Sequence, residues 1–231
     1  MRALALAAVL LLALPAAAAP PGPADRDRAL EILKTSISHR TTASAGQEPM
    51  LAYAGWIKSV LVGAGYRPED IAVEPVAGTA ILIARLPGRD PARKPLVISG
   101  HMDVVEARAE DWTRDPFTPV VENGYVFGRG ATDNKFDISM VVTTLARLRA
   151  ENWRPNRDVI LALSGDEETQ MRSSAFLAQR LKHADLVLNS DAGGGRRPRD
   201  WKPAGFRPYT LIDGKLAPGW RSFGKTRTCW T

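Results

Sequence analysis

The fold is decided by residues 159–168, which read VILALSGDEE. The opening run VILAL is apolar, so it predicts a short strand covered on both of its faces. Three carboxyl groups follow at Asp166, Glu167 and Glu168. Crowded carboxylates in a cleft of low dielectric constant repel one another unless a cation lies nearby, although a solvated acidic turn is the alternative. The stretch therefore predicts a buried strand that ends at a candidate cation site.

Helical and extended patterns alternate on both sides of this strand. Apolar residues recur at helical spacing in some segments, and short apolar runs lie between Gly and Pro turns in others. We expect helices over residues 24–39, 48–63, 132–150 and 173–181, and strands over 71–75, 79–86, 95–99, 159–164 and 186–189. This alternation predicts an α/β fold with a mixed, mostly parallel sheet and helices on both of its faces.

Residues 99–105, SGHMDVV, place a histidine and an acid at the end of a predicted strand. Positions two apart in extended backbone point the same way, so His101 and Asp103 are expected to face one side together. A metal-bound imidazole needs a partner on its other nitrogen, and Asp103 can supply it. The alternative is a histidine that a neighbouring acid merely satisfies.

Two further acids stand at comparable positions. Asp133 lies where the glycine-rich turn GRGATDNK, residues 128–135, becomes a helix, and Asp191 ends the apolar stretch 186–191, LVLNSD. Each has an ordinary alternative, a helix cap for Asp133 and a turn acid for Asp191. No Gly-Lys-Ser or Gly-Lys-Thr follows the glycines, which argues against a phosphate loop.

The polar residues fall at the ends of several predicted strands, where open α/β sheets bind their ligands. This repetition separates a site from a set of unrelated acids. Neighbouring side chains diverge, so Glu167 and Glu168 are expected to do different jobs. One of them can bind a metal ion while the other takes a proton from water.

The net charge of +6 raises the question of a nucleic-acid partner. Residues 196–231 hold nine Lys or Arg against two acids, whereas residues 1–195 hold 22 against 23. A solvated basic tail and a nucleic-acid-binding arm are two interpretations of this segment. We favour a third, in which a frameshift or misjoined reading frame makes residues 196–231 foreign to the domain. We therefore expect no nucleic-acid partner.

The N-terminus has the pattern of a secretory signal peptide. Arg2 precedes an apolar run over residues 3–14, and a string of small residues ends at Ala19. The run is shorter than the ~20 apolar residues that span a bilayer. We expect residues 1–19 to be removed and the protein to be periplasmic or secreted, without stable membrane association. The single cysteine, Cys229, excludes an internal disulfide.

The four motifs together resemble a family of zinc metallopeptidases that includes glutamate carboxypeptidase, acetylornithine deacetylase, succinyl-diaminopimelate desuccinylase and the aminoacylases. The motifs are Gly-His-x-Asp-Val-Val, Gly-Arg-Gly-x-x-Asp-x-Lys, Asp-Glu-Glu and Asn-Ser-Asp, in this order. The resemblance covers about residues 25–195. It implies a zinc-exopeptidase-like catalytic domain over residues 24–195 that cleaves an amide bond of a small peptide or an N-acyl amino acid.

The resemblance also implies a metal-binding set. His101, Asp133 and Asp191 would bind one zinc ion, and Asp133 would bridge to a second zinc ion that Glu168 also holds. Cobalt or manganese can substitute for zinc at ligands of these types.

Roles beyond direct metal binding follow from the same resemblance. Asp103 would orient His101, and Glu167 would be the general base that takes a proton from water. The peptide bond between Asp133 and Asn134 is expected to be cis.

The sequence departs from the family in one respect. In these enzymes a smaller lid domain follows the fourth motif, and a later histidine completes the second zinc site. His39 precedes every motif, and His183 lies in a polar turn that we expect at the surface. We therefore expect a C-terminally truncated catalytic domain without its lid. A catalytically impaired zinc-binding remnant is the alternative to an active hydrolase.

Overall fold

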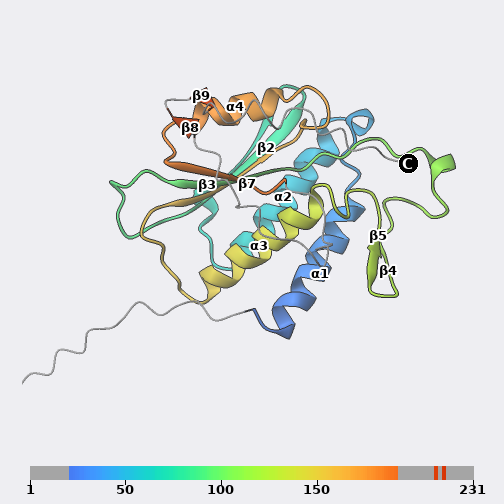
Figure 1. The fold of residues 1–231 in the computed structure, drawn as a ribbon, viewed down its shortest axis with the longest axis horizontal. Helices are drawn as coiled ribbons and strands as arrows, with labels where there is room; N and C mark the ends of the chain where they lie inside the picture. Colours follow the sequence, from blue (N-terminus) through green and yellow to red (C-terminus); the bar gives the residue numbers. More distant parts are fainter. Residues whose placement is uncertain (1–20, 192–210, 213–214, 217–231) are drawn as a thin grey trace, which may run out of the picture.

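The computed structural model describes residues 21–191, 211–212 and 215–216. At its centre lies a five-stranded sheet with the order β1-β2-β6-β3-β7 (Figure 1). The strands are β1 (Ile71–Val76), β2 (Thr79–Leu86), β3 (Leu96–His101), β6 (Val159–Ser164) and β7 (Leu186–Asn189). The predictions for β2, β6 and β7 are confirmed residue for residue, and the prediction for β1 ends one residue early.

The sheet is mixed, as predicted, and its two halves differ. Strand β3 pairs in parallel with β6 and with β7, whereas β2 pairs antiparallel with both β1 and β6. The antiparallel edge arises because β1 and β2 form a hairpin closed by Ala77 and Gly78, whose φ angles are +52° and +83°. Positive φ at both central residues is the requirement of the tight turn that matches strand twist.

Strand β3 runs two residues past its predicted end. Gly100 and His101 pair with Leu163 and Ser164 of β6, so both belong to the sheet. His101 therefore stands on the last position of a central strand. Its backbone is held by the sheet on the side of β6.

Helices cover both faces of the sheet, which confirms the prediction. On one face lie α1 (Pro23–Ser38), α2 (Gln47–Gly63) and α3 (Lys135–Ala150), and on the other lies α4 (Arg172–Arg180) (Figure 1). Helix α3 begins three residues later than predicted because residues 131–134 form the turn that leads into it.

The core has two parts, separated by the sheet. Leu82 and Leu163 face the larger cluster with α2 and α3, whereas Ile81 and Ala162 face the smaller cluster with α4. Successive residues of a strand point to opposite faces, so a central strand buried on both sides needs a continuous apolar run. This requirement explains the uninterrupted pattern of β6 that the sequence displays.

Other elements lie outside the central sheet. They are the hairpin of β4 (Val120–Glu122) and β5 (Tyr125–Phe127), the antiparallel pair β8 (Leu211–Ile212) and β9 (Lys215–Leu216), and three short 3-10 helices (Ala43–Ala45, Pro68–Asp70 and Ala109–Asp111). The expected signal peptide, Cys229 and most of the basic tail fall outside the described residues. Within the described part of the chain, every helix is too short or too polar to cross a bilayer.

Truncating Leu82 to alanine tests the importance of the larger cluster. Leu82 is fully buried, so Leu82→Ala is expected to lower the free energy of unfolding by about 2–5 kcal/mol. The measurement is urea unfolding followed by circular dichroism. Val121→Ala, on the exposed side of the β4–β5 hairpin, is the control and should change stability by less than about 0.5 kcal/mol. A loss below 1 kcal/mol at Leu82 would contradict this packing.

Candidate metal centre

The predicted site residues meet at one edge of the sheet, beyond the carboxyl ends of its parallel strands. His101 closes β3, Glu167 and Glu168 follow β6, and Asp191 follows β7. Asp133 reaches the same place from the turn before α3. Because β3, β6 and β7 run parallel, their carboxyl ends share this edge, and the fold brings together residues far apart in the sequence.

Two groups of possible metal ligands share His101. One group is His101 with Asp133 and Asp191, and the other is His101 with Glu167 and Glu168; within each, the ligand atoms lie within 4.8 Å of one another. The His101 Nε2 atom lies 3.0 Å from Asp133 Oδ1 and 3.9 Å from Asp191 Oδ1. The predicted bridge from Asp133 to an ion shared with Glu168 stays a prediction.

Asp103 holds the other side of the imidazole ring. The His101 Nδ1 atom lies 3.3 Å from Asp103 Oδ1 and 3.1 Å from the Asp103 carbonyl oxygen. A proton on Nδ1 satisfies these acceptors and leaves Nε2 as a lone-pair donor toward Asp133 and Asp191. This is the geometry expected when Asp103 orients His101.

The same carboxylate fixes the loop after β6. Asp103 Oδ1 accepts the backbone N–H of Glu167 at 3.0 Å, and Oδ2 accepts that of Glu168 at 2.9 Å. Asp103 is itself buried. One side chain therefore sets both the tilt of the His101 ring and the direction in which the two glutamates leave the backbone.

Asp166 does not join the site, although the sequence places it in the same acidic run. Its carboxylate accepts the backbone N–H of Arg172 at 2.8 Å and of Ser173 at 3.0 Å, and it also accepts the Ser173 hydroxyl. These groups belong to the first turn of α4, whose N–H groups have no partners within the helix. The expectation that all three acids crowd around a cation is thus wrong for Asp166.

The peptide bond between Asp133 and Asn134 is cis, which confirms the expectation from the family resemblance. Asn134 is a functional residue that the sequence reasoning missed. Its fully buried side chain accepts the N–H of His101 at 3.2 Å and donates to Asp191 Oδ1 at 3.4 Å. A Cβ atom on Gly100 would lie 2.7 Å from Asn134 Oδ1, so glycine is needed for this close approach.

Lys135 was also assigned no role from the sequence. Its side chain is fully buried, and Nζ donates to the carbonyl oxygens of Ser36 at 2.8 Å and His39 at 2.5 Å. The ammonium group also lies 5.1 Å from the centre of the Tyr53 ring. Burial lowers the pKa of Lys135 to about 7, and the charge of Asp103 opposes this shift. The start of α3 is thereby fastened to the end of α1.

The electrostatics of the cluster favour a cation. Burial lowers the pKa of His101, but hydrogen bonds to Asp103 and Asp133 outweigh it and raise the value to about 11. Burial, then repulsion by Asp133, raises the pKa of Glu168 to about 7. Neighbouring carboxylates contribute to both shifts, beside burial in the case of Glu168. One imidazole among carboxylates is a donor set that suits Zn²⁺, Co²⁺ or Mn²⁺.

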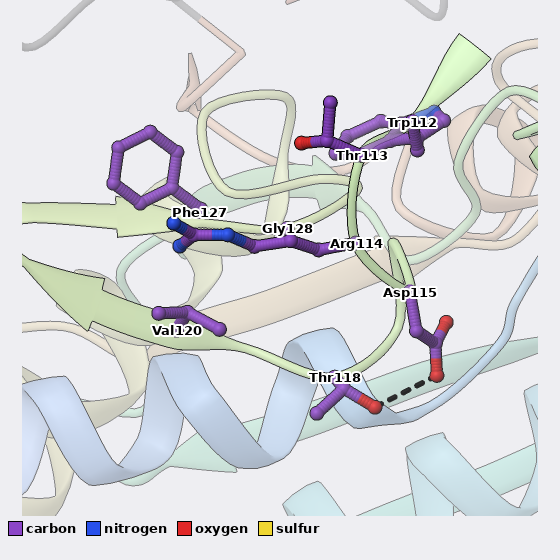
Figure 2. A pocket seen from close by; sticks show the side chains of 8 residues that line it. All are labelled: Trp112, Thr113, Arg114, Asp115, Thr118, Val120, Phe127 and Gly128. Carbon is purple, nitrogen blue, oxygen red and sulfur yellow. Dashed lines mark hydrogen bonds between the residues drawn. The ribbon is translucent and has the colours of Figure 1, made fainter.

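A separate pocket of about 150 Å³ lies between the β4–β5 hairpin and the segment that precedes it (Figure 2). Arg114 stacks over the Phe127 ring at 5.4 Å, and the Thr118 hydroxyl donates to Asp115 at 2.7 Å. None of the residues that line this pocket belongs to either group of possible metal ligands. It is distinct from the metal centre.

Comparison with known proteins agrees with the geometry. Residues 97–204 match the model of "Peptidase family M20/M25/M40". The N-formyl-4-amino-5-aminomethyl-2-methylpyrimidine deformylase of Bacillus subtilis is 30% identical over 168 residues, which are 72% of this chain and 39% of the relative. A probable succinyl-diaminopimelate desuccinylase of Staphylococcus aureus is 36% identical over 104 residues, 43% of this chain and 26% of the relative.

Solved structures share the fold. Human carnosine dipeptidase 1 has a TM-score of 0.60 at 22% identity, covering 73% of this chain and 39% of that protein. The M20 family metallo-carboxypeptidase Sso-CP2 of Sulfolobus solfataricus has a TM-score of 0.59 at 25% identity, covering 71% and 37%. The chain thus spans about two fifths of the length of these proteins and of the Bacillus relative. With the matched motifs and the shared fold, residues 97–204 belong to a domain of peptidase family M20/M25/M40.

Proposed function

We propose that this chain is the metal-bearing part of a zinc-dependent hydrolase that cleaves the amide bond of a peptide or an N-acyl amino acid. The observation that carries the proposal is the position of Asp103 between the His101 ring and the backbone of Glu167 and Glu168. This arrangement orients the His101 ring and the two glutamates, and Asp133 and Asp191 lie beside the same imidazole.

The residues divide the chemical work. When bound, divalent metal ions polarise a carbonyl group and lower the pKa of water. His101, Asp133, Asp191 and Glu168 would hold the metal. Glu167 is half-buried, and burial followed by its acidic neighbours raises its pKa, which makes it a better proton acceptor than an ordinary glutamate. Glu167 takes a proton from water and delivers it to the departing nitrogen.

The names of the relatives support an amide substrate. Those described above are a deformylase and a desuccinylase, and a mouse relative named "N-fatty-acyl-amino acid synthase/hydrolase PM20D1" is 38% identical over 88 residues, 38% of this chain and 18% of the relative. The names refer to a formyl, a succinyl and a fatty-acyl group, and two of them place the acyl group on nitrogen. We extend this class to the present chain as the substrate to test first.

A non-catalytic zinc-binding remnant is the second candidate. His183 is exposed in a turn, and His39 packs against the rings of Tyr53 and Trp56 at 5.1 and 5.8 Å. Within the described part of the chain, His101 is therefore the one imidazole of the ligand groups. One tightly bound zinc ion without Glu167-dependent hydrolysis would favour this candidate.

Replacing the proposed base separates the two candidates. Glu167→Gln is expected to keep the bound zinc but lower amide hydrolysis about 10²–10⁴-fold, because proton transfer is lost while the ligands remain. Zinc content is measured by mass spectrometry, and turnover is measured with N-formyl, N-succinyl and dipeptide substrates.

Glu110→Gln, which alters an exposed acid outside the site, is the matched control and should leave turnover unchanged. Full activity in Glu167→Gln would refute the role of Glu167. A zinc-loaded wild-type chain that hydrolyses none of these substrates would support the remnant.

Neutralising the orienting acid tests the arrangement itself. Asp103→Asn keeps the shape of the side chain but replaces an acceptor oxygen with a donor, so it cannot accept both loop N–H groups. We expect zinc affinity to fall about 10–100-fold, the usual effect of losing a partner of a metal-bound histidine. Zinc affinity is measured by competition with a chromophoric chelator. Asp111→Asn, on the exposed surface, is the control. Equal affinities in the two variants would argue against the proposed role.

Export is part of the proposal and rests on residues 1–19. Protein recovered from the periplasm or culture medium is expected to begin at Pro20, because small residues up to Ala19 precede the predicted cleavage site. Sequencing of the mature N-terminus measures this directly. A protein that keeps Met1 and stays in the cytoplasm would show the prediction to be wrong.

A further inference from the structure

We propose that Lys135 is a positioning residue of the metal centre, which fixes the turn carrying Asp133 against the end of α1. The inference rests on the proposed function, since it concerns the same metal site. Lys135 contacts no proposed ligand through its Nζ atom, whose hydrogen bonds go to Ser36 and His39. Its effect on the metal must therefore pass through the backbone.

Asp133 is followed by two residues that are anchored in different directions. Asn134 reaches the strands, where it bonds to the backbone N–H of His101 and, at 3.5 Å, to the carbonyl oxygen of Ser190. Lys135 reaches the carbonyl oxygens at the end of α1. Two anchors directly after Asp133 that pull toward different elements restrict the backbone of the turn, and Asp133 Oδ1 lies 3.0 Å from His101 Nε2.

The aliphatic part of the Lys135 side chain also packs against the turn that precedes Asp133. A Cβ atom on Gly130 would lie 3.1 Å from Lys135 Cδ and 2.7 Å from Val104 Cγ1, so the backbone of Gly130 packs directly on both side chains. The φ angle of Gly130 is +80°, a conformation that glycine adopts readily. The turn before Asp133 therefore rests on Lys135 and on the residue that follows Asp103.

The carbonyl groups that Lys135 binds lie at the C-terminal end of α1, where the Ser36 carbonyl also accepts the His39 N–H at 3.2 Å. The last carbonyls of an α-helix lack partners within it and carry the negative end of the helix dipole, so an amine is a favourable partner. The Ser36 carbonyl lies in the last turn of α1, and His39 follows its end. Two hydrogen bonds and the Tyr53 ring surround the amine with suitable groups in a fully buried position.

The connector after α1 links this anchor to the other half of the site. The Thr41 hydroxyl donates to the Met102 carbonyl at 2.7 Å, and the N–H of Val104 donates to the Thr41 carbonyl at 3.1 Å. The segment that carries Asp103 is thus hydrogen-bonded to Thr41, in the connector that follows α1. Lys135 binds the same connector through the carbonyl oxygen of His39. Lys135 sets the distance between the Asp133 turn and the His101–Asp103 strand end.

The test compares Lys135→Met with Lys58→Met in the full-length chain. Lys58 is the control because its Nζ also donates to a backbone carbonyl, that of Ile71, at 2.8 Å in a partly buried position. Lys58 lies on α2, which carries none of the proposed metal ligands. We expect Lys135→Met to weaken Co²⁺ and Zn²⁺ binding about 10-fold or more and to change the visible absorption spectrum of bound Co²⁺. Lys58→Met should bind as the wild type does.

A purely structural role predicts a different result. In that case Lys135→Met and Lys58→Met would both lower the unfolding temperature, while metal affinity and the Co²⁺ spectrum stayed as in the wild type; this outcome overturns the inference. Lys135→Gln, whose amide can still donate to one carbonyl, is measured in parallel in case methionine unfolds the chain. It is expected to give an intermediate loss of affinity, and unchanged affinity in this folded variant would also overturn the inference.

Failure of the inference is distinguishable from failure of the proposed function. If the wild-type chain binds neither Co²⁺ nor Zn²⁺, the proposed metal centre itself is wrong. If the wild type binds metal and the Lys135 variants bind it equally well, the metal centre stands and Lys135 has no positioning role.

Discussion

The site depends on one buried carboxylate, that of Asp103, which serves two strands at once. It faces His101 at the end of β3 and accepts two backbone N–H groups from the loop after β6. A buried carboxylate is tolerable only when its oxygens are well satisfied, and charge-assisted hydrogen bonds to N–H groups are among the strongest available. The same contacts that make Asp103 acceptable in the interior therefore also determine where the imidazole and the glutamates point.

The sequence predicts the parts of this architecture that are encoded locally. A buried central strand must be apolar along its whole length, so β6 is visible as a run, and His101, Asp133, Glu168 and Asp191 stand out as polar residues beside such runs or turns. The antiparallel edge was not predicted, although Ala77 and Gly78 form a two-residue turn between two predicted strands. Such patterns predict which residues stand at the ends of strands. Because parallel strands end at the same edge of the sheet, these residues are then expected to lie close together.

The roles of Asp166, Asn134 and Lys135 could not be predicted in this way, because each depends on a partner from another element. Asp166 directly precedes Glu167 in the sequence, yet its side chain points away from the metal-ligand groups. It points instead toward the first turn of α4, where it accepts the N–H of Arg172. Lys135 is an ordinary polar residue of a helix start until α1 is placed beside it, with carbonyls nearly a hundred residues away in the chain. These roles are determined by tertiary contacts, and they cannot be predicted from residue type alone.

Backbone contacts at the ends of the strands also support the carboxylate-rich site. The N–H of Met102 donates to the Ser164 carbonyl at 2.7 Å, and that of Ser190 donates to the Ser99 carbonyl at 2.8 Å, which extends the pairing of β3 past the ends of its neighbours. Burial, and after it repulsion by Asp133, acts against the charged form of Glu168, as its raised pKa indicates. The backbone that carries these acids is held by main-chain hydrogen bonds, so their Cα atoms cannot separate without breaking the ends of the sheet. A fixed backbone that brings several carboxylates together is an arrangement that a divalent cation would stabilise.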